Sequence, residues 1–72
     1  MDFTVVIEQD ENGVYVAEVS ELEGCYTQGK TLQEVVERIK EAAEVCLEED
    51  NSVISKKFIG IQRIQVEKPL PV

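Results

Sequence analysis

Residues 31–47 read TLQEVVERIKEAAEVCL, and this stretch decides the fold because its apolar residues recur every three or four positions. That spacing places them along one side of an α-helix. Thr31 and Glu34 have the spacing of a capping box, in which the hydroxyl accepts from the backbone N–H of Glu34 and the carboxylate accepts from the N–H of Thr31. We therefore expect an amphipathic helix that opens at Thr31 and ends at Asn51, a residue type that tolerates the left-handed region. Its apolar stripe comprises Leu32, Val35, Val36, Ile39, Ala43, Cys46 and Leu47.

Two short runs rich in Val precede this helix, at residues 3–7 and 14–19. The Asn12-Gly13 pair between them is the signal of a tight hairpin, because both residues tolerate positive φ. After a turn at residues 20–24, residues 25–28 are expected to form a third strand. Both faces of the second run are partly apolar, so its periodicity does not decide which face meets the helix.

A fourth strand is expected at Phe58–Glu67, downstream of the helix. We expect this strand to run parallel to the first and third strands and to reach the sheet by a right-handed crossover connection. Phe58, Ile59 and Ile61 make the start of this segment apolar on both faces, which indicates burial by the helix on one side and by a second chain on the other. We therefore expect a single α+β domain over residues 1–72, with one helix packed on a four-stranded mixed sheet in the order β-β-β-α-β. We also expect a homodimer whose interface includes Phe58, Ile59 and Ile61.

The chain is short and strongly acidic. Its 72 residues carry 15 acidic and 7 basic side chains, for a net charge of −8. Such a balance disfavours direct nucleic-acid binding, which depends on Lys and Arg, and it favours a basic protein partner, although it also suits plain solubility. No apolar run approaches the roughly 20 residues that cross a membrane. The N-terminus has no basic segment followed by an apolar run, so we expect no secretory signal, no membrane contact and a cytoplasmic location.

No pattern in the sequence is typical of a metal, cofactor or catalytic site. The chain has no His, and its two cysteines, Cys25 and Cys46, lack the spacing of zinc ligands, so both are expected to be reduced. Metal-dependent cleavage would need several carboxylates to converge on two ions. Convergence depends on the hairpin register, and we expect no enzyme activity. The candidate carboxylates are Glu8, Asp10, Glu18 and Glu21.

Several short motifs together resemble the HicB family of antitoxins. They are the hairpin at residues 10–17, the loop Leu22-Glu23-Gly24-Cys25, and residues 28–35, which lead into the helix. The family loop often reads Leu-Pro-Gly-Cys and its helix start Gly-x-Thr-x-Glu-Glu-Ala, so Glu23, Gln33 and Val35 depart from the pattern. The resemblance covers about residues 3–50.

The resemblance implies a partial ribonuclease-H-like fold and a HicA-like partner, a small basic toxin that cleaves messenger RNA. It also implies a domain without the C-terminal DNA-binding module that many family members carry. An acidic antitoxin can mask the toxin's RNA-binding surface by electrostatic complementarity. The expected partner-binding residues are Glu18, Glu21, Glu23 and Tyr26. The alternatives are an oligomeric interaction domain with no toxin, and RNA binding through Phe3, Tyr15 or Tyr26, which the acidic balance disfavours.

Overall fold

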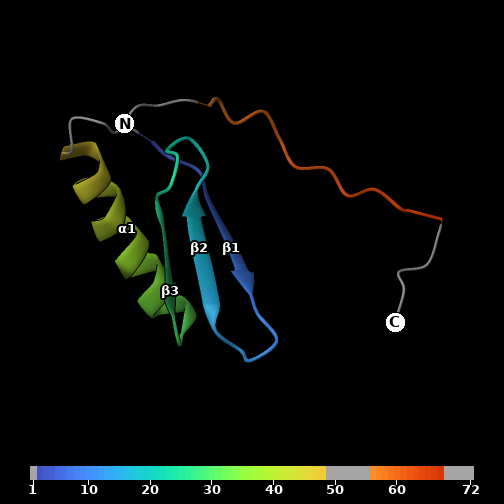
Figure 1. Cartoon of the computed structure of the whole chain (residues 1–72), viewed down its shortest axis with the longest axis horizontal. Helices are drawn as coiled ribbons and strands as arrows, with labels where there is room; N and C mark the ends of the chain where they lie inside the picture. Colours follow the sequence, from blue (N-terminus) through green and yellow to red (C-terminus); the bar gives the residue numbers. More distant parts are fainter. Residues whose placement is uncertain (1, 49–55, 68–72) are drawn as a thin grey trace.

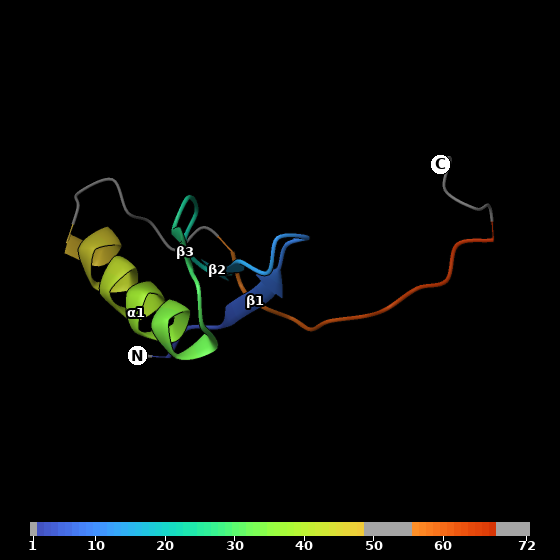
Figure 2. The same ribbon diagram turned by 90° about the horizontal axis from the view of Figure 1, so that it is seen from below.

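The computed structural model describes residues 2–48 and 56–67. Three strands, β1 (Val5–Gln9), β2 (Tyr15–Val19) and β3 (Tyr26–Gly29), form an antiparallel sheet in the order β1-β2-β3. One helix, α1 (Leu32–Glu48), lies on one face of this sheet (Figure 1). It packs mainly against β2 and β3, which leaves the β1 side of that face less covered (Figure 2). The α+β class is confirmed.

The expected hairpin joins β1 and β2, but its turn is longer than an Asn-Gly pair requires. Gly13 has a φ of +83°, whereas Asn12 does not take a positive φ. The loop is held by Asp10, whose carboxylate accepts from the backbone N–H groups of Asn12 and Val14, each at 2.9 Å. An aspartate whose carboxylate accepts hydrogen bonds from backbone N–H groups of the residues that follow it stabilises a turn, as a helix N-cap residue stabilises the start of a helix. The hairpin prediction is confirmed, and of the Asn12-Gly13 pair only Gly13 uses the positive φ that both residues tolerate.

The loop between β2 and β3 closes the hydrophobic core. Leu22 and Cys25 are buried, together with Ala17 and Val19 of β2 and two residues of α1, Val35 and Ile39. Gly24 has a φ of +75°, a conformation that glycine adopts without the steric cost of a Cβ. The odd-numbered face of β2 therefore meets the helix, a choice that the sequence pattern left open.

Helix α1 begins as the capping box predicts, with one difference. The backbone N–H of Glu34 donates to the Thr31 hydroxyl at 3.0 Å. The Glu34 carboxylate, however, accepts from the N–H of Lys30 at 3.4 Å rather than from that of Thr31. It also pairs with Arg38 one turn later, at 3.2 Å. The residue expected to end the helix, Asn51, lies outside the described residues.

The fourth strand expected at Phe58–Glu67 is not present, and the prediction of a four-stranded mixed sheet is wrong for the described residues. Residues 56–67 form no regular element and run away from the sheet (Figure 1). A strand exists only when its backbone pairs with a neighbouring strand. This segment has no such neighbour among the residues that the structure describes. The partial ribonuclease-H-like arrangement, which requires that strand, is therefore not seen either.

Candidate partner-binding surfaces

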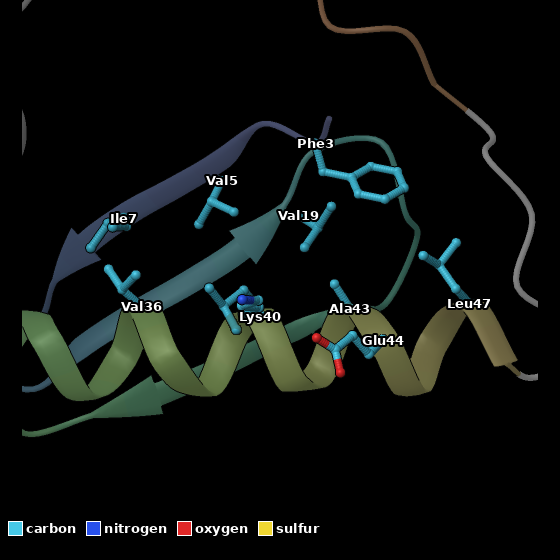
Figure 3. A pocket seen from close by; sticks show the side chains of 10 residues that line it. Phe3, Val5, Ile7, Val19, Val36, Lys40, Ala43, Glu44 and Leu47 are labelled. Atoms are coloured by element: carbon cyan, nitrogen blue, oxygen red, sulfur yellow. The ribbon is translucent and has the colours of Figure 1, made fainter. Parts of the chain in front are cut away.

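An apolar groove of about 380 Å³ lies between β1 and α1. Val5 and Ile7 line it from β1, and Val36 and Leu47 line it from α1 (Figure 3). The remaining lining residues are Phe3, Val19, Ile39, Lys40, Ala43 and Glu44. Only Lys40 and Glu44 of this set carry charge, so the groove is suited to apolar side chains.

The groove exists because the apolar stripe of α1 is wider than the part of the sheet that covers it. Val35 and Ile39 are buried against β2 and β3, whereas Val36 remains 47% exposed. Val5 and Ile7 point to the same side of the sheet as the buried Ala17 and are about one-third exposed. An apolar surface shared by two elements and covered by neither typically marks a binding site.

The outer edge of β1, which pairs with no strand of the described residues, is a second exposed surface beside the groove. Ser20 N donates to the Thr4 carbonyl at 2.8 Å, and Asp10 N donates to the Val14 carbonyl at 2.9 Å. Hydrogen-bonded and non-hydrogen-bonded positions alternate along an antiparallel pair. Even-numbered residues of β1 therefore pair with β2, and the odd-numbered residues Val5 and Ile7 direct their N–H and C=O groups to the free edge.

The outer edge of β3 is different because Arg38 already occupies one of its backbone carbonyl groups. The same alternation directs the Gln28 carbonyl away from β2, since Val19 N donates to the Cys25 carbonyl at 2.9 Å. The Arg38 guanidinium donates to that Gln28 carbonyl at 3.0 Å. Helix α1 packs directly against this strand as well. Within the described ranges, the sheet thus has one edge that is partly covered by α1 and Arg38, and one edge, on β1, that pairs with no other strand.

The face of the sheet opposite α1 carries two of the predicted partner-binding residues. Glu18 and Tyr26 lie directly opposite each other on β2 and β3, and both are exposed, Tyr26 to 68%. Glu8 lies on the same face, diagonal to Glu18, because its partner in the register is Val16. Glu23 is exposed in the adjacent loop. An aromatic ring beside carboxylates is a combination suited to a basic partner.

Glu21 is engaged within the fold. Its carboxylate accepts from the backbone N–H of Thr4 at 2.8 Å, which fastens the start of β1 to the loop after β2. This backbone hydrogen bond holds the pKa of Glu21 below its ordinary value. Of the four predicted partner-binding residues, Glu21 is therefore the one that already has a structural role.

The candidate metal-binding carboxylates do not form a cluster in the described part of the chain. Glu8 and Glu18 share a face, but Asp10 holds the hairpin turn and Glu21 holds Thr4. No group of three or more side chains suited to a metal ion occurs among the described residues.

The two cysteines are free thiols in the core region. Cys25 is buried, and Cys46 is half-buried against the same cluster. Burial, together with the neighbouring Cys46 thiol, raises the pKa of Cys25 to about 12. A thiol with a raised pKa is a poor nucleophile. Cys25 therefore acts as a small apolar residue.

The aromatic residues considered for RNA stacking do not form one platform. Phe3 and Tyr15 pack against the core on the helix side of the sheet, and Tyr26 lies on the opposite face. No described helix has the length and apolar character needed to cross a bilayer.

The predicted interface residues lie in the segment that leaves the sheet. Phe58 is half-buried, whereas Ile59 and Ile61 are 86% and 78% exposed. The groove was not predicted from the sequence. Its signal was present in the helix pattern, because the seven-residue stripe is wider than three short strands can cover.

These features define a small α+β domain with two candidate binding surfaces: an apolar groove beside the outer edge of β1, and an acidic face with one exposed aromatic ring. The sequence profile for the HicB-like antitoxin of bacterial toxin–antitoxin systems matches residues 3–68. The chain therefore belongs to the HicB-like antitoxin family.

Relatives of nearly equal length are found in bacteria and archaea. The chain is 49% identical over 67 residues to a UPF0150 protein of Archaeoglobus fulgidus, covering 93% of this chain and 97% of the relative. It is 46% identical over 65 residues to the UPF0150 protein ssr1258 of Synechocystis, covering 90% and 94%. A UPF0150 protein of Thermotoga maritima is 39% identical over 67 residues, covering 90% and 89%. No solved structure matches the chain significantly.

Proposed function

We propose that this protein is an antitoxin that works in the cytoplasm and neutralises a small basic HicA-like toxin by covering the toxin's RNA-binding surface. Membership of the antitoxin family supports a role of this type. The observation that carries the finer proposal is the pairing of exposed Glu18 and Tyr26 on the uncovered face of the sheet.

The charge of the folded body favours this partner. Residues 2–48 carry twelve acidic and three basic side chains. A ribonuclease binds RNA phosphates with Lys and Arg, so an acidic surface can compete for the same groups. Tyr26 supplies an amphipathic anchor that packs and donates a hydrogen bond at once. Glu8 and Glu23 extend the acidic surface on either side.

The test first asks whether the adjacent gene encodes a small basic protein. Where it does, that protein is purified alone and cleavage of labelled RNA is the measurement. The wild-type chain is expected to inhibit cleavage. Glu18→Lys combined with Tyr26→Ala should raise the half-inhibitory concentration at least tenfold, a change of about 1.4 kcal/mol. Glu41→Lys on the exposed side of α1 makes the same charge change away from this surface. It should leave inhibition within about twofold, because an isolated surface charge contributes little.

Two outcomes would count against the toxin-binding role. If Glu41→Lys loses as much inhibition of RNA cleavage as the variant that combines Glu18→Lys with Tyr26→Ala, then the total charge of the protein, and not this face of the sheet, determines inhibition. Absence of a basic ribonuclease gene beside this one, with no inhibition of any toxin, would favour the second candidate function.

The second candidate is an oligomeric interaction domain, and the exposed apolar segment favours it. Ile59 and Ile61 are among the most exposed large apolar residues of the described chain. Small domains bury a limited share of their surface and are marginally stable, so covering these groups in a dimer would stabilise the fold. We propose a homodimer that buries Phe58, Ile59 and Ile61. Sedimentation velocity at micromolar concentration should then give twice the chain mass of 8.1 kDa, and a monomer would refute it.

A further inference from the structure

The groove and the free edge of β1 form an acceptor site, and we propose that residues 58–66 of a second copy of this chain occupy it. Each copy gives its segment to the other, so the exchange is reciprocal. The inference rests on the proposed dimerisation and adds the place at which the segment binds.

The backbone of β1 supplies the first half of the acceptor. Val5 and Ile7 direct their N–H and C=O groups to an edge that lacks a partner among the described residues. An extended segment can add to such an edge as a further strand, through main-chain hydrogen bonds. The opposite edge is not equivalent, because Arg38 already donates to the Gln28 carbonyl there.

The groove supplies the second half. Val5 and Ile7 point into it from the same strand that offers the backbone edge, and Val36 faces them from α1 (Figure 3). A strand added beside β1 would place every second side chain over this groove. Apolar side chains at alternating positions are therefore the chemistry that the site selects.

The segment has the matching pattern. Ile59 and Ile61 are two residues apart, so they point to the same side of a strand, and Gly60 between them has nothing within 4 Å of its Cβ position. Residues 56–67 carry three basic side chains and one acidic one, against twelve acidic and three basic in residues 2–48. Opposite charge favours association of the segment with the body.

A second copy is the occupant because the segment does not cover the groove of its own chain. Residues 59–67 are all exposed and run away from β1 (Figure 2). Each copy carries one donor segment and one acceptor site, which is the self-complementary arrangement that a two-fold dimer closes. In the closed pair both open β1 edges and both grooves are covered.

The experiment tests donor and acceptor separately, with a control for each, by sedimentation velocity of the full chain. The donor variant is Ile61→Lys and its control is Gln62→Lys, which adds the same charge at the neighbouring position. The acceptor variant is Val36→Lys and its control is Val45→Lys. Val45 lies on the same helix and is similarly exposed, at 55%, but it does not line the groove.

The wild-type chain and both controls should be dimers, and Ile61→Lys and Val36→Lys should each be at least tenfold weaker in dimer dissociation constant. A mixture of Ile61→Lys with Val36→Lys should recover dimers, because the first variant keeps an intact acceptor and the second keeps an intact donor. Hydrogen exchange at the amides of Val5 and Ile7 should be slow in the wild-type dimer and fast in Ile61→Lys. Circular dichroism of each variant checks that α1 remains folded.

Three results would overturn the inference, and each differs from failure of toxin binding, which the RNA-cleavage assay measures independently. A dimer that persists in both Ile61→Lys and Val36→Lys would place the interface elsewhere while leaving dimerisation intact. A monomer in which Val5 and Ile7 are protected, with protection lost in Ile61→Lys, would assign the segment to its own chain. A monomer with unprotected amides would refute both the dimer and its site.

Discussion

Gly29, at the end of β3, should be among the least replaceable residues of the chain. A Cβ at this position would lie 3.0 Å from the backbone N and 3.2 Å from the Cα of Val35 in α1. These are main-chain atoms at the first turn of a helix, so they cannot move aside without shifting the helix against the sheet. Overpacking of this kind costs about 1–3 kcal/mol. Replacing Gly by Ala also stiffens the unfolded chain, which returns about 0.4–1 kcal/mol.

The expected net loss for Gly29→Ala is therefore about 1–2 kcal/mol in free energy of unfolding. In a domain of this size each 1 kcal/mol shifts the melting temperature by about 4–8 °C. Urea denaturation and thermal melts followed by circular dichroism measure both quantities. All variants are compared at one protein concentration, because dimerisation would make the melting temperature depend on concentration.

Two other glycines separate steric contact from backbone strain. Gly24→Ala introduces no contact within 4 Å but places Ala at a φ of +75°, which costs about 1–2 kcal/mol. Gly60→Ala adds neither a contact nor a positive φ within its own chain, so it should change stability little at a protein concentration where the chain is monomeric. If Gly29→Ala and Gly60→Ala have the same melting temperature at that concentration, the close approach of β3 to α1 is refuted.

Three further predictions follow from hydrogen bonds and thiol ionisation. Thr31→Ala should lower the free energy of unfolding by about 1 kcal/mol in urea denaturation, because the Glu34 N–H loses its cap. Cys25 keeps its proton in the folded chain up to about pH 12 but ionises near its ordinary value of 9.0 when unfolded, so stability should fall as pH rises through that window, by up to about 1.4 kcal/mol per pH unit. A Cys25→Ala variant, measured by the same pH series, should lack that slope. The lowered pKa of Glu21 means that its bond to Thr4 contributes above the ordinary glutamate pKa and is lost as pH falls below it; Glu21→Gln should therefore flatten the acid limb of the stability curve.

Elements that depend on local chemistry could be predicted from the sequence. The helix follows from the spacing of its apolar residues and from Thr31 and Glu34, and the structure confirms it with a shift of one residue in one capping bond. The hairpin was predicted from the Asn12-Gly13 pair, but the role of Asp10 was missed. An aspartate ahead of a turn is a recognisable signal, and it explains why the loop is longer than two residues.

Features that depend on distant contacts could not be predicted in the same way. The face of β2 that meets α1 is decided by packing of Ala17 and Val19 on Val35 and Ile39, which no periodicity within β2 encodes. Phe58–Glu67 has the composition of a strand, yet composition cannot supply a pairing partner. In the loop Leu22-Glu23-Gly24-Cys25 only Glu23 was expected to bind a partner, and its side chain is exposed. The sequence did not predict that Leu22 and Cys25 of the same loop are buried in the core.

The hydrogen bond from Arg38 to Gln28 also limits how far copies of this sheet can grow. Amyloid-like fibres require two open edges on every molecule, so that each added copy exposes a fresh template. Here a guanidinium occupies an outward carbonyl on one edge, which leaves β1 as the edge available for recruitment. In the proposed reciprocal pair both β1 edges would be occupied, so neither β1 edge would be left to recruit a further copy, and the apolar segment would be covered rather than exposed.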